Sequence, residues 1–141
     1  MTGVNYTKAD GARIMEKFRD TKALIVDLRC YPREFMIFDF IGRYFMPRTS
    51  PHVIWLAPTG ALPGVFHELQ DSLFVNPDNP AVAENPDYYK GRVIVLVDSS
   101  TQSQAEYTAM AFQATPRCTV VGTQTAGADG NISALVMPGG D

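Results

Sequence analysis

Four hydroxyl side chains gather where an apolar run at 92–97 gives way to a helical pattern at 102–114: Ser99, Ser100, Thr101 and Ser103. A sharp turn from a buried strand into a helix places a side chain at the edge of a sheet, where ligands of open α/β folds bind. The first N–H groups of such a helix also favour a developing negative charge. A serine held there can attack a carbonyl if a base takes its proton. The pattern is therefore compatible with acyl-transfer chemistry at this turn.

The same segment has a structural interpretation. Ser103-Gln104-Ala105-Glu106 matches the Ser-x-x-Glu capping box, in which the serine side chain accepts from a backbone N–H and the glutamate reaches back to the cap. Any α/β protein can contain such a cap. On the local sequence alone the cap is favoured over the catalyst, because the spacing by itself does not make Ser103 a nucleophile.

The segments before and after this turn alternate between helical and extended patterns. Apolar residues at helical spacing predict a helix at 7–18, with Thr7 or Asp10 as its cap, and continuous apolar runs predict strands buried on both faces. The strand at 92–97, the helix and a strand at 118–121 make a βαβ crossover, so the sequence predicts an α/β fold. The remaining expected elements are a strand at 23–26, a helix at 34–45, a strand at 52–57 and a strand at 132–137. The aromatic residues of 34–45 leave a strand as the alternative there.

Residues 58–90 interrupt this alternation. They are rich in Pro, Asn and Asp, and they indicate a long irregular excursion with one short hairpin around 65–75. The aromatic stretch at 35–45 is interpreted as core, or as a surface for a partner helix, rather than as a ligand site.

Composition and charge exclude several classes of protein. With 141 residues, of which 45% are hydrophobic and 19% charged, the chain fits one ordinary soluble globular domain. A net charge of −3 gives no basic footprint for nucleic acid, and no stretch reaches the roughly 18 apolar residues that span a bilayer. The first residues lack the apolar stretch of a signal peptide.

Cysteine usage and motif spacing give no sign of a metal or a cofactor. Cys30 and Cys118 lack the spacing of a disulfide framework or a zinc site, and both are predicted to be buried or half-buried free thiols. The glycine-containing loop at 122–130 lacks the Lys and Ser/Thr of a phosphate-binding loop.

From Arg92 to Gly127 the sequence resembles the core of the C-terminal-processing (tail-specific) serine peptidases and their tricorn-core relatives. The matching elements, in order and without a gap, are VIVLV, TQSQAE, YTAMAFQA, RCTVVG and TQTAG. Upstream, ALIVDLR at 23–29 resembles the family's apolar strand that ends in Asp-Leu-Arg. MPGG at 137–140 is similar to a Pro-Gly-Gly strand end of many members. The resemblance thus covers most of the chain.

This resemblance implies a serine-type endopeptidase that acts on peptides or proteins through an acyl-enzyme. The family nucleophile is the serine three residues before the glutamate, which is Ser103 here, and the N–H of Gln104 is the matching oxyanion donor. The implied fold is of the Clp-protease/crotonase type, with stacked ββα units and a mostly parallel sheet flanked by helices. A periplasmic or secreted location is implied as well, without a cofactor.

The sequence departs from the family at the base and at the oxyanion loop. The bacterial processing enzymes have a lysine just after the Thr-x-Gly loop, where this chain has Ala128, so a Ser–Lys dyad is not expected. The tricorn-like layout places a histidine upstream and a glutamate downstream, both outside 1–141. After Asp-Leu-Arg the family has a glycine-rich stretch, where this chain has CYPRE. Pro32 has no N–H, so Tyr31 or Arg33 would have to donate there, and Gly127 is a further candidate for the substrate loop.

The other polar candidates have simpler interpretations. His52 opens a strand and His67 lies in the excursion; both are interpreted as solvated surface histidines. His67 is the first alternative base, because the excursion could fold over the site. Asp98 is interpreted as a turn residue, and Asp27 and Arg29 as a structural ion pair.

We expect residues 1–141 to form one domain, an incomplete peptidase core that is inactive by itself. An incomplete α/β unit leaves apolar surface uncovered, which favours a homo-oligomer. The alternative function is a non-catalytic binding or interaction module on the same fold. A crotonase-like acyl-thioester enzyme would share the fold, but the Ser-x-x-Glu turn does not support it.

Overall fold

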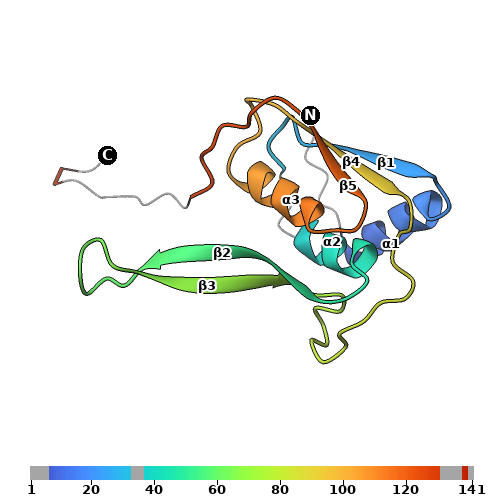
Figure 1. Ribbon diagram of the computed structural model, residues 1–141, viewed down its shortest axis with the longest axis horizontal. Coiled ribbons are helices and arrows are strands. Elements are labelled where there is room, and N and C mark those ends of the chain that lie inside the picture. Colours follow the sequence, from blue (N-terminus) through green and yellow to red (C-terminus); the bar gives the residue numbers. More distant parts are fainter. Residues whose placement is uncertain (1–6, 33–36, 131–137, 140–141) are drawn as a thin grey trace.

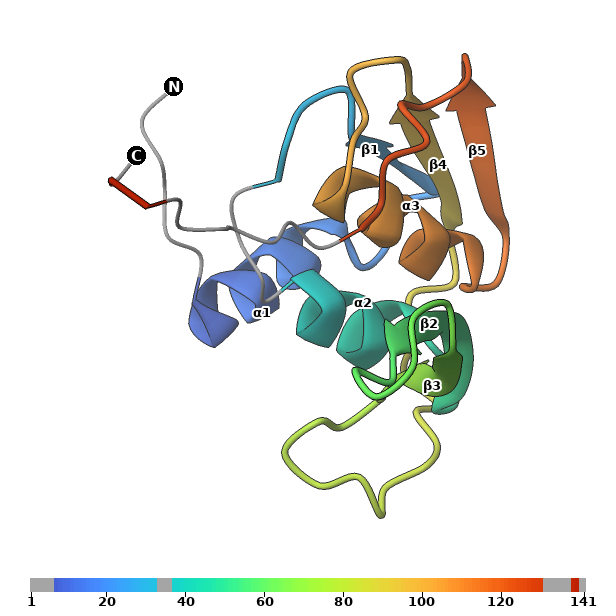
Figure 2. The same ribbon diagram turned by 90° about the vertical axis from the view of Figure 1, so that its left-hand side faces the viewer.

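The computed structural model describes residues 7–32, 37–130 and 138–139. Three helices lie on one side of a three-stranded parallel sheet with the order β1-β4-β5, and a two-stranded hairpin lies below them (Figures 1 and 2). The predicted α/β class, with a parallel sheet and flanking helices, is confirmed. The elements are α1 (Lys8–Phe18), β1 (Ala23–Asp27), α2 (Ile37–Phe45), β2 (Ser50–Pro58), β3 (Phe66–Leu73), β4 (Arg92–Val97), α3 (Gln104–Gln113) and β5 (Cys118–Gly122).

The central strand β4 supplies the core of the sheet. Successive side chains of a strand point to opposite faces, so Val93, Val95 and Val97 lie together on the helix side, each no more than 5% exposed. They pack with Phe112 of α3 and Ile41 of α2 in one cluster. Burial of side chains of this size stabilises the fold by about 1.5–3 kcal/mol each.

The opposite face of the sheet is more open. Ile25 of β1 is 67% exposed and Val121 of β5 is 48% exposed. The prediction that the short apolar runs are buried on both faces is therefore wrong for β1. The physical reason is that, within the described residues, the helices cover one face of the sheet only.

The crossover from β4 through α3 to β5 was predicted and is confirmed. The helix lies close to its neighbours because Ala105 and Ala109, which are four residues apart and share one face of α3, are small and at most 8% exposed. β5 ends at Gly122, whose φ is +144° and whose missing Cβ would lie 1.8 Å from the carbonyl oxygen of Val97. Only glycine fits this position, where the chain leaves the sheet for the 123–130 loop.

The helix predicted at 7–18 is confirmed, with Thr7 as its cap. The Thr7 hydroxyl accepts a 3.3 Å hydrogen bond from the N–H of Asp10, and the Asp10 carboxylate accepts one of 2.9 Å from the N–H of Thr7. This reciprocal pair is a capping box with aspartate in the glutamate position.

The hairpin corrects one expectation. A short hairpin within 65–75 was predicted, but β3 instead pairs antiparallel with β2, from Ser50 opposite Leu73 to Pro58 opposite Phe66. The chain reverses in the connection at 59–65, where Gly60 and Gly64 have φ of +72° and +79°. These positive angles are costly for residues with a Cβ, so the two glycines place the turn earlier than the composition indicated.

Some predictions lie outside the described residues. These are the strand at 132–137, the start of the helix at 34–45, and Arg33. Among the described residues, no helix is long and apolar enough to cross a membrane. No group of three or more metal-ligating side chains occurs in that part of the chain either.

The two cysteines differ in exposure. Cys118 is half-buried and free, as predicted, and burial raises the pKa of its thiol. Cys30 is free but exposed, so its predicted burial is wrong. It follows β1 in a segment that runs along the surface beside Tyr31, which is 56% exposed.

Candidate active site

Ser103 lies where the turn after β4 enters α3. It is the N-cap residue, immediately before the helix rather than inside its first turn, and it is half-buried. Its φ of 52° and ψ of −121° are unusual for a residue with a side chain, and Arg117 is the one other described non-glycine residue with positive φ. Such a conformation costs on the order of 1–3 kcal/mol and persists only where neighbouring contacts enforce it.

One enforcing contact comes from Thr101, which is fully buried. Its hydroxyl donates to the carbonyl of Leu28 at 2.9 Å and accepts from the N–H of Asp98 at 3.0 Å. The turn before Ser103 is thereby tied to the residue that follows β1. Thr101 is one of the candidate hydroxyls at this turn, but no local pattern predicts this role, since Leu28 lies 73 positions away.

Glu106 supplies the second set of contacts. Its carboxylate accepts hydrogen bonds from the N–H of Ser103 at 3.0 Å, the Thr125 hydroxyl at 2.6 Å, and the N–H groups of Gly127 and Ala128 at 2.7 and 2.9 Å. Glu106 is 8% exposed. One carboxylate therefore joins the turn at Ser103 to the loop at 125–128.

The charge of Glu106 is favoured by these donors. Burial would raise the pKa of this carboxyl, but the hydrogen bonds from Thr125, Ala128, Gly127 and Ser103 outweigh burial and hold the pKa below its ordinary value. Asp129 shows the opposite effect, because burial and the neighbouring Glu106 charge raise its pKa. The pKa values of these two neighbouring carboxyl groups are thus shifted in opposite directions.

The Glu106 half of the Ser103–Glu106 capping box is present, because the Glu106 carboxylate accepts from the N–H of Ser103, whereas the Ser103 side chain makes no cap hydrogen bond to the start of α3. The structural interpretation of this motif is therefore realised in that half. Glu106 does more than cap the helix, however, because its carboxylate also accepts hydrogen bonds from Thr125, Gly127 and Ala128 of the loop.

The other predicted site residues are placed as follows. Gln104 is the first residue of α3, next to Ser103, and is 8% exposed. The N–H of Gly127 donates to Glu106, so it holds the loop in place. Ala128, at the position of the family lysine, holds the same carboxylate through its N–H. Tyr31 is exposed beside Pro32, and Arg33 lies outside the described residues.

Asp27, Arg29 and Asp98 have the roles that the sequence indicated. The Arg29 guanidinium donates to both carboxylate oxygens of Asp27 at 2.9 and 2.8 Å, and these bonds lower the pKa of Asp27 to about 2. The Asp98 carboxylate accepts from the Ser100 hydroxyl at 2.6 Å and from its N–H at 2.8 Å.

His52 is not a solvated surface histidine, so that prediction is wrong. Both ring nitrogens are buried without a hydrogen-bond partner among the residues that the structure describes, and the ring packs edge-on against Tyr107 of α3 at 5.2 Å. Burial lowers the pKa of His52, although the charge of Asp71 opposes this. His67, farther along the hairpin, is exposed as predicted.

A cluster around Tyr107, which no local sequence pattern predicts, joins the hairpin to α3. The Tyr107 hydroxyl donates a short hydrogen bond to the Asp71 carboxylate, and the Trp55 ring lies 5.1 Å from the Tyr107 ring. Burial and the bond to Asp71 raise the pKa of Tyr107. The one sequence feature that could have indicated this cluster is Tyr107 itself, one helical turn after Ser103.

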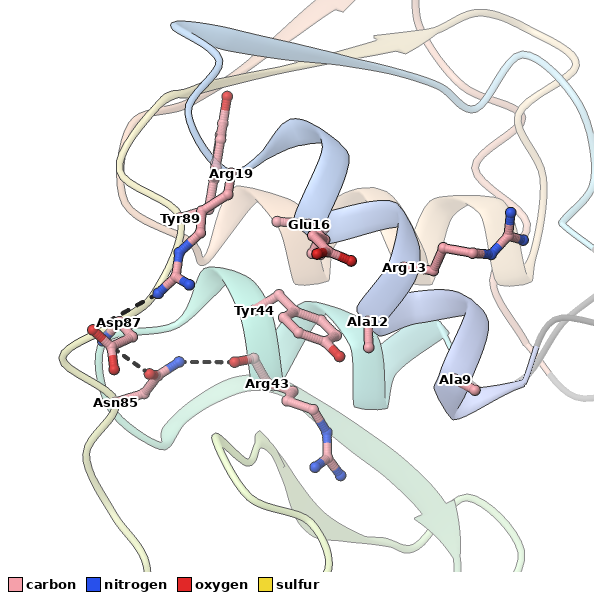
Figure 3. A pocket seen from close by; sticks show the side chains of 11 residues that line it. Ala9, Ala12, Arg13, Glu16, Arg19, Arg43, Tyr44, Asn85, Asp87 and Tyr89 are labelled. Carbon is pink, nitrogen blue, oxygen red and sulfur yellow. Dashed lines mark hydrogen bonds and ion pairs between the residues drawn. The ribbon is translucent and has the colours of Figure 1, made fainter.

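A groove of about 670 Å³ lies elsewhere in the molecule. Figure 3 shows the side chains that line it. It lies between α1, α2 and the segment 85–89, and α3 contributes nothing to it. Two of its arginines are paired with carboxylates: Arg19 lies 4.0 Å from Asp87 of the same groove, and Arg43 lies 2.8 Å from Asp78, which is not part of the lining. Its lining residues are Ala9, Ala12, Arg13, Met15, Glu16, Arg19, Arg43, Tyr44, Asn85, Asp87 and Tyr89. This groove is therefore not the site around Ser103.

A comparison with protein-family models decides the identity. The model of peptidase family S41 matches residues 64–141, which is more than half of the chain and includes Ser103 and Glu106. The chain belongs to peptidase family S41. The resemblance to C-terminal-processing peptidases that the motifs indicated is confirmed at the level of this family.

The fold of the S41 chain has a close counterpart among solved structures. The crystal structure of a candidate peptidase from Parabacteroides merdae ATCC 43184 superposes with a TM-score of 0.74 at 16% identity. The superposition covers 99% of this S41 chain and 42% of the other protein, so the chain spans less than half of that protein's length. No curated protein matches the sequence. The parallel sheet flanked by helices agrees with the Clp-protease/crotonase-like fold expected for the family.

Proposed function

We propose that this chain carries the nucleophile of a serine-type endopeptidase and that Ser103 is that nucleophile. The observation that supports this most strongly is the backbone of Ser103, which has positive φ between the end of β4 and the start of α3. Thr101 and Glu106 hold the neighbouring backbone. Strained residues at the entrance to a helix are frequent at catalytic sites.

The proposed reaction is acyl transfer. The Ser103 oxygen bonds to the carbonyl carbon of the scissile peptide while a base takes the hydroxyl proton. The carbonyl oxygen becomes an oxyanion, the peptide C–N bond then breaks, and the amine leaves with a proton. Water later hydrolyses the ester and releases Ser103.

The N–H of Gln104 is the proposed oxyanion donor. It opens α3 next to the nucleophile, at the end of the helix where the aligned peptide dipoles favour negative charge. The N–H groups of Gly127 and Ala128 are engaged by Glu106, so we assign them to the support of the loop.

We place the general base outside this chain. Ala128 stands where the processing enzymes have lysine, and Lys90 donates to the carbonyl of Pro86 at 2.7 Å. Within the part of the chain that the structure describes, no imidazole or amine is hydrogen-bonded to Ser103. Residues 1–141 alone are therefore expected to be inactive, and the processing of C-terminal segments would belong to the longer protein.

The test is a comparison of three proteins: residues 1–141, the longer protein that contains them, and its Ser103→Ala variant. Each is treated with a fluorophosphonate probe and assayed with casein. The longer protein is expected to label and to cleave, and the other two to do neither. Labelling of residues 1–141 would place a base inside the chain, and His52 rather than His67 would be examined first because its ring contacts α3. Unchanged cleavage by Ser103→Ala would favour the binding-module alternative.

A further inference from the structure

One face of the β2–β3 hairpin carries several exposed apolar side chains. In an antiparallel pair, directly opposed residues share a face. Ile54, Leu56 and Phe66 lie on one side of the hairpin, and their side chains are 53%, 64% and 56% exposed. We call this side the outer face; its members are Ile54, Leu56, Pro58, Phe66, Glu68 and Gln70.

The opposite face anchors the hairpin to the helix that begins beside Ser103. Trp55 and Asp71 belong to this inner face and both contact Tyr107. Tyr107 is four residues after Ser103, one helical turn along α3. Figure 1 shows the hairpin passing below α3 and projecting well beyond it. The hairpin thus extends from the candidate active site into solvent.

The described part of the hairpin is a two-stranded sheet, so each strand has an open edge. An open edge presents backbone donors and acceptors to which an extended peptide can pair. β2 contains Pro51 and Pro58, which lack an N–H, whereas β3 contains no proline. β3 is therefore the better edge for an added strand.

The charge of this region is one-sided. Residues 49–89 contain no Lys or Arg but five acidic residues: Glu68, Asp71, Asp78, Glu84 and Asp87. Asp71 is engaged by Tyr107, and Asp78 and Asp87 lie near arginines. Glu68 is exposed on the outer face of β3, two residues after the exposed ring of Phe66.

We propose that the edge of β3 binds an extended segment of the substrate polypeptide, away from the scissile bond. The segment carries an apolar residue and a Lys or Arg two positions apart, which lie beside Phe66 and Glu68. The two-residue spacing follows from the strand period, because side chains two positions apart share a face. This inference rests on the proposed peptidase function, for which it names a substrate class.

Binding is measured on the Ser103→Ala form of the intact protein, so that catalysis plays no part. The probe is a fluorescein-labelled decapeptide with Leu and Lys two positions apart, followed by anisotropy. Phe66→Ser is expected to weaken binding about tenfold and Glu68→Lys roughly fivefold. Val82→Ser and Glu84→Lys, which change exposed residues outside the hairpin, are the matched controls and should bind like the parent.

Two peptide variants make the test specific. A Lys→Glu peptide should bind the parent weakly and regain affinity with Glu68→Lys, because the charge pair is then reversed. A peptide with N-methyl groups along one edge should bind the parent at least tenfold more weakly, because strand pairing needs those N–H donors. Emission from Trp55, the chain's single tryptophan, verifies in each variant that the hairpin still contacts Tyr107.

The proposal is overturned if the hairpin variants and the N-methylated peptide bind like the parent while the Trp55 signal is retained. It is also overturned if sedimentation shows a dimer that Glu68→Lys dissociates, since the edge would then pair two copies of the chain. Peptide binding without Ser103 labelling would retain this inference and reject the peptidase. Labelling of Ser103 without peptide binding would retain the peptidase and reject this inference.

Discussion

The Glu106 carboxylate accepts a 2.7 Å hydrogen bond from the N–H of Gly127, 21 positions farther along the chain. The same carboxylate also accepts from the N–H of Ser103 at 3.0 Å. The geometry of Ser103 and the position of the loop after β5 therefore depend on one buried side chain. Glu106 acts through other residues and is a positioning residue.

Replacement of Glu106 by glutamine is the first prediction. The amide cannot accept all the donors that face the carboxylate, so Glu106→Gln should lower the free energy of unfolding by about 2 kcal/mol or more. Ser103 should also lose probe labelling in the longer protein. Urea denaturation and labelling measure the two effects. Glu16→Gln, on the exposed side of α1, is the control. Equal stability and equal Ser103 labelling in the two variants would contradict the positioning role of Glu106.

The second prediction concerns the contact between hairpin and helix. Tyr107→Phe keeps the ring packing but removes the donor to Asp71, so it should cost about 1–2 kcal/mol of stability. Trp55 emission follows the unfolding directly, because this ring lies against Tyr107. Tyr31→Phe changes an exposed ring and should leave stability within error. If Tyr31→Phe loses stability and Tyr107→Phe does not, the Tyr107–Asp71 hydrogen bond does not hold the hairpin to α3.

The third prediction is a pH dependence caused by His52. Burial lowers the pKa of His52 below the ordinary value of 6.5, so the unfolded chain binds a proton more readily than the folded one. Stability should therefore fall as the pH drops through about 6.5, and be fully retained above it. The lowered pKa values of Asp71 and Glu106 act in a separate window, where stability is lost below about pH 4.5.

Unfolding free energies of three proteins between pH 7.5 and 5.5 provide the measurement. His52→Phe keeps the edge-on ring contact with Tyr107 and should remove the decline. His67→Gln, at an exposed position of the same hairpin, should decline like the parent. A decline that persists in His52→Phe would assign the titration to another group.

The fourth prediction tests the close approach at the end of β5. Gly122→Ala places a Cβ 1.8 Å from the carbonyl oxygen of Val97, at a φ of +144°, so the strand end must shift. We expect a loss of about 3 kcal/mol or more, together with poorer order in the 123–128 loop. Gly127→Ala, which has φ of +67° but nothing within 4 Å, should lose much less. Similar losses in both variants would mean that backbone strain, and not the contact with Val97, dominates.

The elements that depend on local pattern could be predicted from the sequence. β4, α3 and β5 carry strong apolar runs or helical spacing, and the Ser-x-x-Glu motif identified Ser103 and Glu106. The partner of β3 was missed because the composition of 58–90 indicated an irregular segment, whereas the two positive-φ glycines of the connection reverse the chain there and place β3 opposite β2. The burial of His52 was missed for a related reason: it follows from the hairpin lying on α3, which no local pattern records.

The second role of Glu106 also lay beyond the sequence. The capping box predicts its bond to Ser103, whereas its bonds to Thr125 and Ala128 require the loop to return across the sheet. The buried bond from Thr101 to Leu28 has the same origin. Contacts between residues tens of positions apart come from the fold, so the supporting residues of the site emerge only from the structure.

The central claim is that Ser103 is the nucleophile, and mass spectrometry of the labelled protein tests it most directly. The longer protein that contains this chain is treated with a fluorophosphonate probe, digested and analysed for the modified peptide. We expect one adduct, on Ser103, in the longer protein. The Ser103→Ala variant should show neither this adduct nor casein cleavage. An adduct on another residue, or full cleavage by Ser103→Ala, would contradict it.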